Sequence, residues 1–126
     1  MLADKKSLRP IIHTIHKNLD SSELEIFQNE CLRPIIKLQH QLIMSYFECF
    51  LTKYESTYSK VDVQMKKEFV EENFRTNQEL KTNMRALIIG LFTLEEYNFY
   101  LTNRTEVNRR INSIIFQRVV SVYFKK

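Results

Sequence analysis

The scarcity of glycine and proline is the feature of this sequence that most constrains its fold. The 126 residues contain one Gly and two Pro. All-β folds place Gly and Pro at many tight turns, so their scarcity indicates a few long helices with few connections. A chain of this length can bury a core without disulfides or metal. We therefore predict an all-α fold, a single-domain bundle of four to five helices.

Apolar spacing and capping residues define the expected helices. Apolar residues between positions 22 and 54 recur every three or four residues in two neighbouring rows, which predicts a long first helix, kinked or broken at Pro34. Later helices are expected over residues 62–75, 77–92, 94–101 and 105–124, with a polar turn over 53–62. Capping boxes, in which Ser, Thr or Asn precedes Glu by three residues, are expected at Ser22/Glu25, Thr76/Glu79, Thr93/Glu96 and Asn103/Glu106. Residues 1–21 are interpreted as an N-terminal arm and residues 22–126 as the helical bundle domain.

Charge and cysteine content restrict the function classes only loosely. The net charge of +4 permits contact with nucleic acid or anionic lipid without requiring it. Cys31 and Cys49 are too few for a disulfide framework and are expected to be reduced. The first twenty residues lack the apolar run of a signal peptide, and the longest apolar run, residues 86–92, is too short to span a membrane. We expect a cytoplasmic protein with no membrane span.

Two histidines raise the question of a metal site. His13 and His16 are three residues apart, a spacing that places both on one face of a helix, and Glu30 or His40 could supply a third ligand. However, no H-E-x-x-H spacing, nucleophile triad, Gly-rich phosphate loop or Cys-x-x-Cys pair occurs. We interpret these histidines as ordinary surface or partly buried residues, and we predict no metal, no cofactor and no catalytic residue.

The last predicted helix is rich in arginine. Its basic side chains could form an anion-binding face for phosphate groups, although charged faces are more often simply solvated and no helix-turn-helix pattern precedes this one. Against the single acid Glu106, the basic residues from position 104 onward are Arg104, Arg109, Arg110, Arg118, Lys125 and Lys126.

A second polar cluster surrounds Pro34. Pro34 removes one backbone donor and frees the carbonyl of Glu30, so nearby polar side chains would either satisfy the kink or line a small pocket. The structural role is the favoured interpretation. The cluster consists of Gln28, Asn29, Arg33, Pro34 and Gln39.

The segments "FQNECLRPIIKLQHQLI" (27–43) and "LTNRTEVNRRINSIIFQRVVS" (101–121) resemble a family of small uncharacterised bacterial proteins with the motif F-Q-N-x-x-L-R-P-[IL]-x-K-x-Q. The resemblance covers most of the chain from Ser21 onward, and it implies that Gln28, Asn29, Arg33 and Pro34 form a shared motif. Some members carry a glyoxalase label by automatic transfer. Glyoxalase I-like folds are α/β with His and Glu metal ligands from strands, which this sequence opposes, so no catalytic residue is carried over.

The pentapeptide LRPII occurs twice, at residues 8–12 and 32–36, but its surroundings differ, which argues against duplication of a structural unit. Among functions, we favour a non-enzymatic protein that acts through protein contact as a homodimer, because the fifteen Phe and Tyr residues exceed what a small monomer easily buries. The alternatives are a nucleic-acid-binding accessory protein that uses the basic C-terminal helix, and an enzyme or small-ligand binder with a polar pocket near Arg33.

Overall fold

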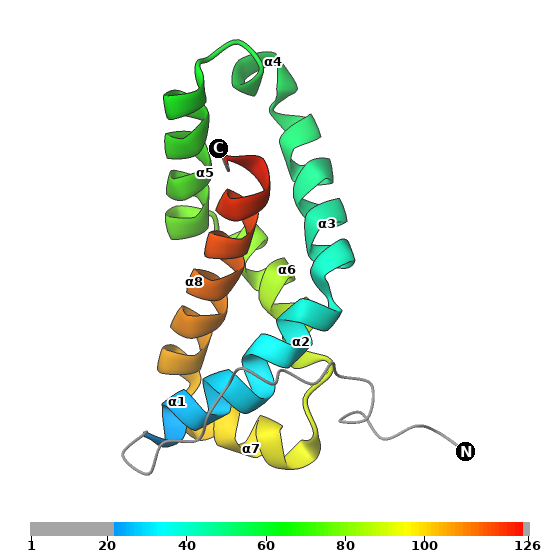
Figure 1. Ribbon diagram of the computed structural model, residues 1–126, viewed down its shortest axis with the longest axis vertical. Coiled ribbons are helices and arrows are strands. Elements are labelled where there is room, and N and C mark those ends of the chain that lie inside the picture. The colour runs from blue at the N-terminus through cyan, green and yellow to red at the C-terminus, as the bar shows by residue number, and fades with distance from the viewer. Residues whose placement is uncertain (1–21, 125–126) are drawn as a thin grey trace, which may run out of the picture.

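The computed structural model describes residues 22–124, and every regular element in this range is helical (Figure 1). The all-α class is therefore confirmed. The expected N-terminal arm, residues 1–21, and the terminal Lys125 and Lys126 lie outside the described residues.

The expected first helix is divided into successive pieces. These are α1 (Glu23–Phe27), a π-helical turn η2 (Gln28–Leu32), α2 (Arg33–Leu38) and α3 (His40–Lys53). The backbone N–H of Arg33 donates to the carbonyl of Gln28, five residues earlier, which is the bond that defines a π turn. Pro34 follows directly, in the first turn of α2, and its ring would crowd the carbonyl of Glu30 in a regular α-helix. The wider π turn relieves this crowding without ending the helical path.

The remaining helices follow the predicted order. They are α4 (Glu55–Tyr58), α5 (Val63–Thr76), α6 (Gln78–Ile89), α7 (Leu94–Thr102) and α8 (Arg104–Tyr123). The polar segment 53–62, expected to be a turn, contains the short helix α4, so this expectation was only partly right. The α5–α8 boundaries lie within a few residues of the predicted ones, because the apolar spacing of each helix is regular.

Two of the four expected capping boxes have the predicted N-cap. The Ser22 hydroxyl accepts a hydrogen bond from the backbone N–H of Glu25 at 3.1 Å. Thr93 and Glu96 form the complete reciprocal box, with the Thr93 hydroxyl accepting from the Glu96 N–H at 3.1 Å and the Glu96 carboxylate accepting from the Thr93 N–H at 2.9 Å.

The other two predicted caps are wrong. Thr76 is the last residue of α5 and its hydroxyl donates to the carbonyl of Glu72, while the neighbouring Asn77 caps α6. The Asn103 side chain makes no cap hydrogen bond to α8, and its amide instead donates to the carbonyl of Phe99 at the end of α7. In both cases the side chain lies between two successive helices and hydrogen-bonds to a carbonyl of the first one.

Helix α8 is the centre of the core. It contacts η2, α5, α6 and α7, and Figure 1 shows it running along the length of the molecule. Its inward residues, Val107, Ile111, Ile115 and Val119, recur every four positions and are fully buried. Burying an aliphatic side chain of this size contributes about 1.5–3 kcal/mol, so this stripe is a major source of stability. All nine Phe residues are likewise buried or half-buried.

Candidate anion-binding site

The two polar clusters expected from the sequence meet at one pocket. This pocket has a volume of about 200 Å³ and lies between the π turn and α8. Its lining includes three arginines and no acidic side chain, and in full it consists of Gln28, Arg33, Arg109, Arg110, Ser113, Ile114 and Gln117. The pocket therefore presents positive charge and hydrogen-bond donors to whatever enters it.

Arg110 is the best-supported cation of this pocket. Its Nη1 donates to Oε1 of Gln28 at 3.1 Å, across 82 residues of sequence. Its Nε lies 3.7 Å from Glu106 Oε1, an ion-pair distance that is too long for a hydrogen bond. This Nε is buried and has no hydrogen-bond partner among the described residues. A guanidinium group has five N–H donors, so Arg110 retains donors for an additional acceptor.

Arg109 belongs to the same helical turn and is paired with Glu106. Both Nε and Nη2 of Arg109 donate to Glu106 Oε1, the Nε contact at 3.1 Å. Hydrogen bonding from Arg109, with the positive charges of Arg109 and Arg110, lowers the pKa of the Glu106 carboxyl from its ordinary value. Glu106 therefore stays ionised and holds both arginines in place, although it neutralises only one of the two charges.

Arg118 extends the positive region by two turns of α8. Its Nη1 donates to Nδ1 of His40 at 3.1 Å, because a guanidinium cannot accept a hydrogen bond. Burial and the nearby charge of Arg33 lower the pKa of Arg118. Arg33 itself is exposed, and its Nε donates to Oδ1 of Asn29 at 3.3 Å. Arg33 and Arg118 thus repel one another, and an anion between the helices would relieve that repulsion.

The remaining predicted residues lie elsewhere or have structural roles. The Gln39 amide donates to the backbone carbonyl of Leu87 at 2.9 Å, which satisfies a carbonyl in the last turn of α6. Pro34 is buried in the first turn of α2. Arg104 lies over the ring of Tyr100, 5.8 Å from its centroid, and does not line the pocket. Of the four predicted arginines, Arg109 and Arg110 line this pocket and Arg104 and Arg118 do not.

Sequence reasoning missed Ser113 and Gln117 as pocket residues and His40 as the partner of Arg118. The sequence contains a signal that identifies Ser113 and Gln117. Arg110, Ser113 and Gln117 are spaced by three and four residues, which is the spacing of one helix face. Applied to polar as well as apolar residues, this periodicity identifies the face of α8 that lines the pocket.

The candidate metal ligands lie partly outside and partly within the described residues. His13 and His16 lie outside the described residues. Within residues 22–124, no three His, Cys, Asp or Glu side chains are grouped so that they could hold a metal ion. Cys31 is buried, Cys49 is exposed, and the two are not joined by a disulfide.

Comparisons with known proteins find no relative: no protein-family model matches the chain, and neither curated proteins nor solved structures yield a match. In the part of the chain that the structure describes, no helix is long and apolar enough to cross a membrane. The bacterial family resemblance and the cytoplasmic location stay predictions.

Proposed function

We propose that this protein binds a small phosphate-bearing ligand in the pocket between η2 and α8. The observation that supports this is the meeting of Arg33, Arg109 and Arg110 around a concavity whose lining contains no acid. The planar guanidinium group matches the oxygen geometry of phosphate in a bidentate manner, and Arg is preferred wherever such recognition matters. Gln28 orients Arg110 before the ligand arrives, which reduces the entropy lost on binding.

A small ligand fits this pocket better than a nucleic acid does. A volume of about 200 Å³ accommodates a phosphate or pyrophosphate group, and the pocket is concave. Nucleic-acid backbones are bound by longer tracks of cations or by aromatic stacking platforms. Here Arg104 lies over the Tyr100 ring and Arg118 donates to His40, and neither residue lines the pocket.

The proposal is tested by calorimetric titration of the full chain with pyrophosphate at low salt. Saturable binding at one site is expected. Arg110→Gln and Arg33→Gln should each weaken it about tenfold or more, because a hydrogen bond to a charged group contributes ~1.5–3 kcal/mol. Arg75→Gln is the matched control, since Arg75 is exposed on α5 and paired with Glu72. No heat with pyrophosphate, or equal losses in all three variants, would contradict the proposal. Tighter binding of a single-stranded oligonucleotide than of pyrophosphate would favour the nucleic-acid alternative.

A second candidate function is protein contact through self-association, favoured by an apolar stripe on α7. Leu94, Tyr97 and Leu101 are 75%, 39% and 41% exposed, and their spacing places them on one side of the helix. Light scattering at high micromolar concentration should then give the mass of a homodimer, and the double variant Leu94→Ser/Leu101→Ser should give a monomer. Leu42→Ser, at an exposed leucine of α3, is the control. A monomeric parent protein would contradict this candidate.

A further inference from the structure

The basic side chains of α8 continue past the phosphate pocket. Arg118 lies eight residues after Arg110, about 12 Å further along the helix axis. It directly follows Gln117, which lines the pocket, but it does not line the pocket itself. Burial, and after it the charge of Arg33, lowers the pKa of Arg118, so these two cations are close enough to repel each other. Since Arg33 lines the pocket, the pocket cations and Arg118 belong to one positive region.

Two side-chain contacts join α8 to the first half of the chain within this region. Arg110 donates to Gln28 in η2, and Arg118 donates to His40 at the start of α3. Each contact uses one Nη1 donor, so each guanidinium group keeps further N–H donors for an anion. The two arginines are held by different partners, which favours an extended anion that reaches both over a single compact phosphate.

Helix α2 lies between these two partners in the chain and carries two exposed cations. Arg33 and Lys37 are four residues apart, which places them on one face of the helix. We call Arg110, Arg33, Lys37 and Arg118 the basic row. Neither residues 31–47 nor residues 107–124 include an Asp or Glu, so no acid of these segments neutralises the row.

We propose that the site binds an oligophosphate, a chain of three or more phosphoryl groups, which starts in the pocket and continues along the basic row to Lys37 and Arg118. This inference rests on the proposed phosphate binding and adds the length of the ligand. The pocket volume of about 200 Å³ accommodates phosphate or pyrophosphate, so a third phosphoryl group lies outside it, beside the remaining cations of the row. Each added group brings negative charge that these cations neutralise.

The phosphate chain, and not an attached base, is the recognised part of the ligand. Among the described residues that line the pocket none is aromatic, so the pocket offers no ring on which a nucleobase could stack. Inorganic tripolyphosphate and adenosine triphosphate should therefore bind with similar affinity.

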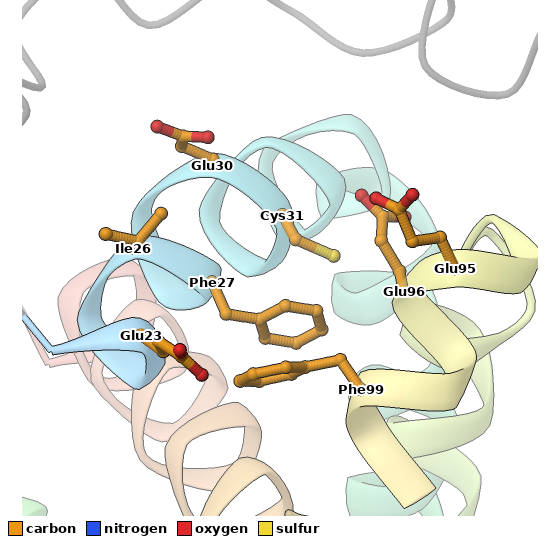
Figure 2. A pocket seen from close by; sticks show the side chains of 8 residues that line it. All are labelled: Glu23, Ile26, Phe27, Glu30, Cys31, Glu95, Glu96 and Phe99. Atoms are coloured by element: carbon orange, nitrogen blue, oxygen red, sulfur yellow. The ribbon is translucent and has the colours of Figure 1, made fainter.

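The larger pocket between α1, the π turn and α7 does not compete for such a ligand. Its volume is about 330 Å³. Figure 2 shows the rings of Phe27 and Phe99 face to face at its base, with four glutamates also among its lining residues. None of its described lining residues is basic, so it offers no cation to a phosphate group.

Calorimetric titration of the full chain with phosphate, pyrophosphate and tripolyphosphate at low salt tests the length of the ligand. Arg118→Gln should weaken tripolyphosphate binding about tenfold, the effect of losing one hydrogen bond to a charged group, and leave pyrophosphate binding nearly unchanged. The parent protein should accordingly bind tripolyphosphate more tightly than pyrophosphate. Arg104→Gln is the matched control, because it removes the same charge from α8 at a side chain that lies over the Tyr100 ring.

Lys37→Gln provides a second variant, because replacing Arg118 also removes its contact with His40. Lys37 is exposed, and its loss should weaken tripolyphosphate binding about threefold, the effect of one surface ion pair. Lys53→Gln, at the exposed last residue of α3, removes the same charge away from the row and should have no effect. Circular dichroism confirms that each variant stays folded.

The possible results separate this inference from the proposed function. Equal affinity for pyrophosphate and tripolyphosphate would overturn the inference and leave the phosphate site intact, whereas no heat with either ligand would overturn both. Equal losses in Arg118→Gln and Arg104→Gln would mean that net charge, and not the basic row, binds the ligand. Tighter binding of adenosine triphosphate, or of a single-stranded oligonucleotide, than of tripolyphosphate would also overturn it.

Discussion

Gln28 accepts a hydrogen bond from Arg110 at 3.1 Å, and this contact joins the π turn to the central helix across 82 residues of sequence. Helix propensity and apolar spacing act within one segment, so they do not predict that these two residues meet. The contact exists because α8 packs against η2. It fixes Arg110, whose Nε also lies at an ion-pair distance of 3.7 Å from Glu106 Oε1.

A double-mutant cycle measures the strength of this contact. We expect Gln28→Ala and Arg110→Ala to be coupled by about 1 kcal/mol in urea unfolding, since a partly exposed hydrogen bond to a charged group lies near the lower end of its range. The matched pair Gln117→Ala with Arg110→Ala shares the pocket but has no hydrogen bond between its members among the described contacts, and it should show little coupling. Equal coupling in both cycles would mean that the Gln28 contact has no special role.

Gln39 should matter for stability and not for ligand binding. Its amide satisfies the carbonyl of Leu87 from another helix, so Gln39→Ala leaves that carbonyl without this donor. The expected loss is about 1–2 kcal/mol in the free energy of unfolding. Gln41→Ala, at an exposed neighbouring position, should change stability by less than about 0.5 kcal/mol. A neutral Gln39→Ala would show that water replaces this bond at no cost.

The central position of α8 predicts a large effect of core truncation. Ile111 is fully buried, so Ile111→Ala should destabilise the fold by about 2–5 kcal/mol through lost burial and the cavity left behind. Val122→Ala, on the same helix but 51% exposed, should have a small effect. Chemical denaturation of both variants gives the comparison, and similar losses would contradict the assignment of α8 as the core helix.

Glu106 should contribute to stability in a pH-dependent way. Its pKa is lowered in the folded state, chiefly by the hydrogen bond from Arg109, so its contribution is present above the unfolded pKa and is lost as pH falls through the folded pKa. Glu106→Gln should therefore be less stable than the parent protein at neutral pH, and the difference should shrink below the ordinary pKa of 4.5 and vanish once the pH is below the lowered pKa of the folded state. Glu71→Gln on α5 is the control. A difference that persists unchanged at acid pH would have another cause.

Much of the fold could be predicted from the sequence because its signals are local. The Thr93/Glu96 box and the four-residue spacing from Val107 to Val119 each depend on one helical turn of sequence. The failed caps mark the limit of such signals. Asn103 follows α7 and precedes α8. Only the three-dimensional structure shows that its amide donates to the carbonyl of Phe99.

The two parts of the candidate site could be predicted from the sequence, but their meeting in one pocket could not. Arg33 and the arginines of α8 were both identified as unusual charges, each within its own helix. Their meeting depends on how η2 packs against α8, which no local pattern encodes. The π turn also changes which residues share a face, because it inserts extra backbone before Pro34. The predicted apolar residues beyond Leu32 are nonetheless buried, among them Ile35, Ile36, Ile43 and Phe47.

Phosphate binding is tested most directly by the Nε–Hε resonances of the arginines in a ¹H–¹⁵N spectrum during titration with pyrophosphate. Arg110 and Arg33 both line the pocket, so the Nε–Hε resonances of both should shift saturably. The resonances of Arg75 and Arg104, away from the pocket, should stay in place. Small, unsaturable shifts of similar size at all four arginines would contradict a phosphate site between η2 and α8.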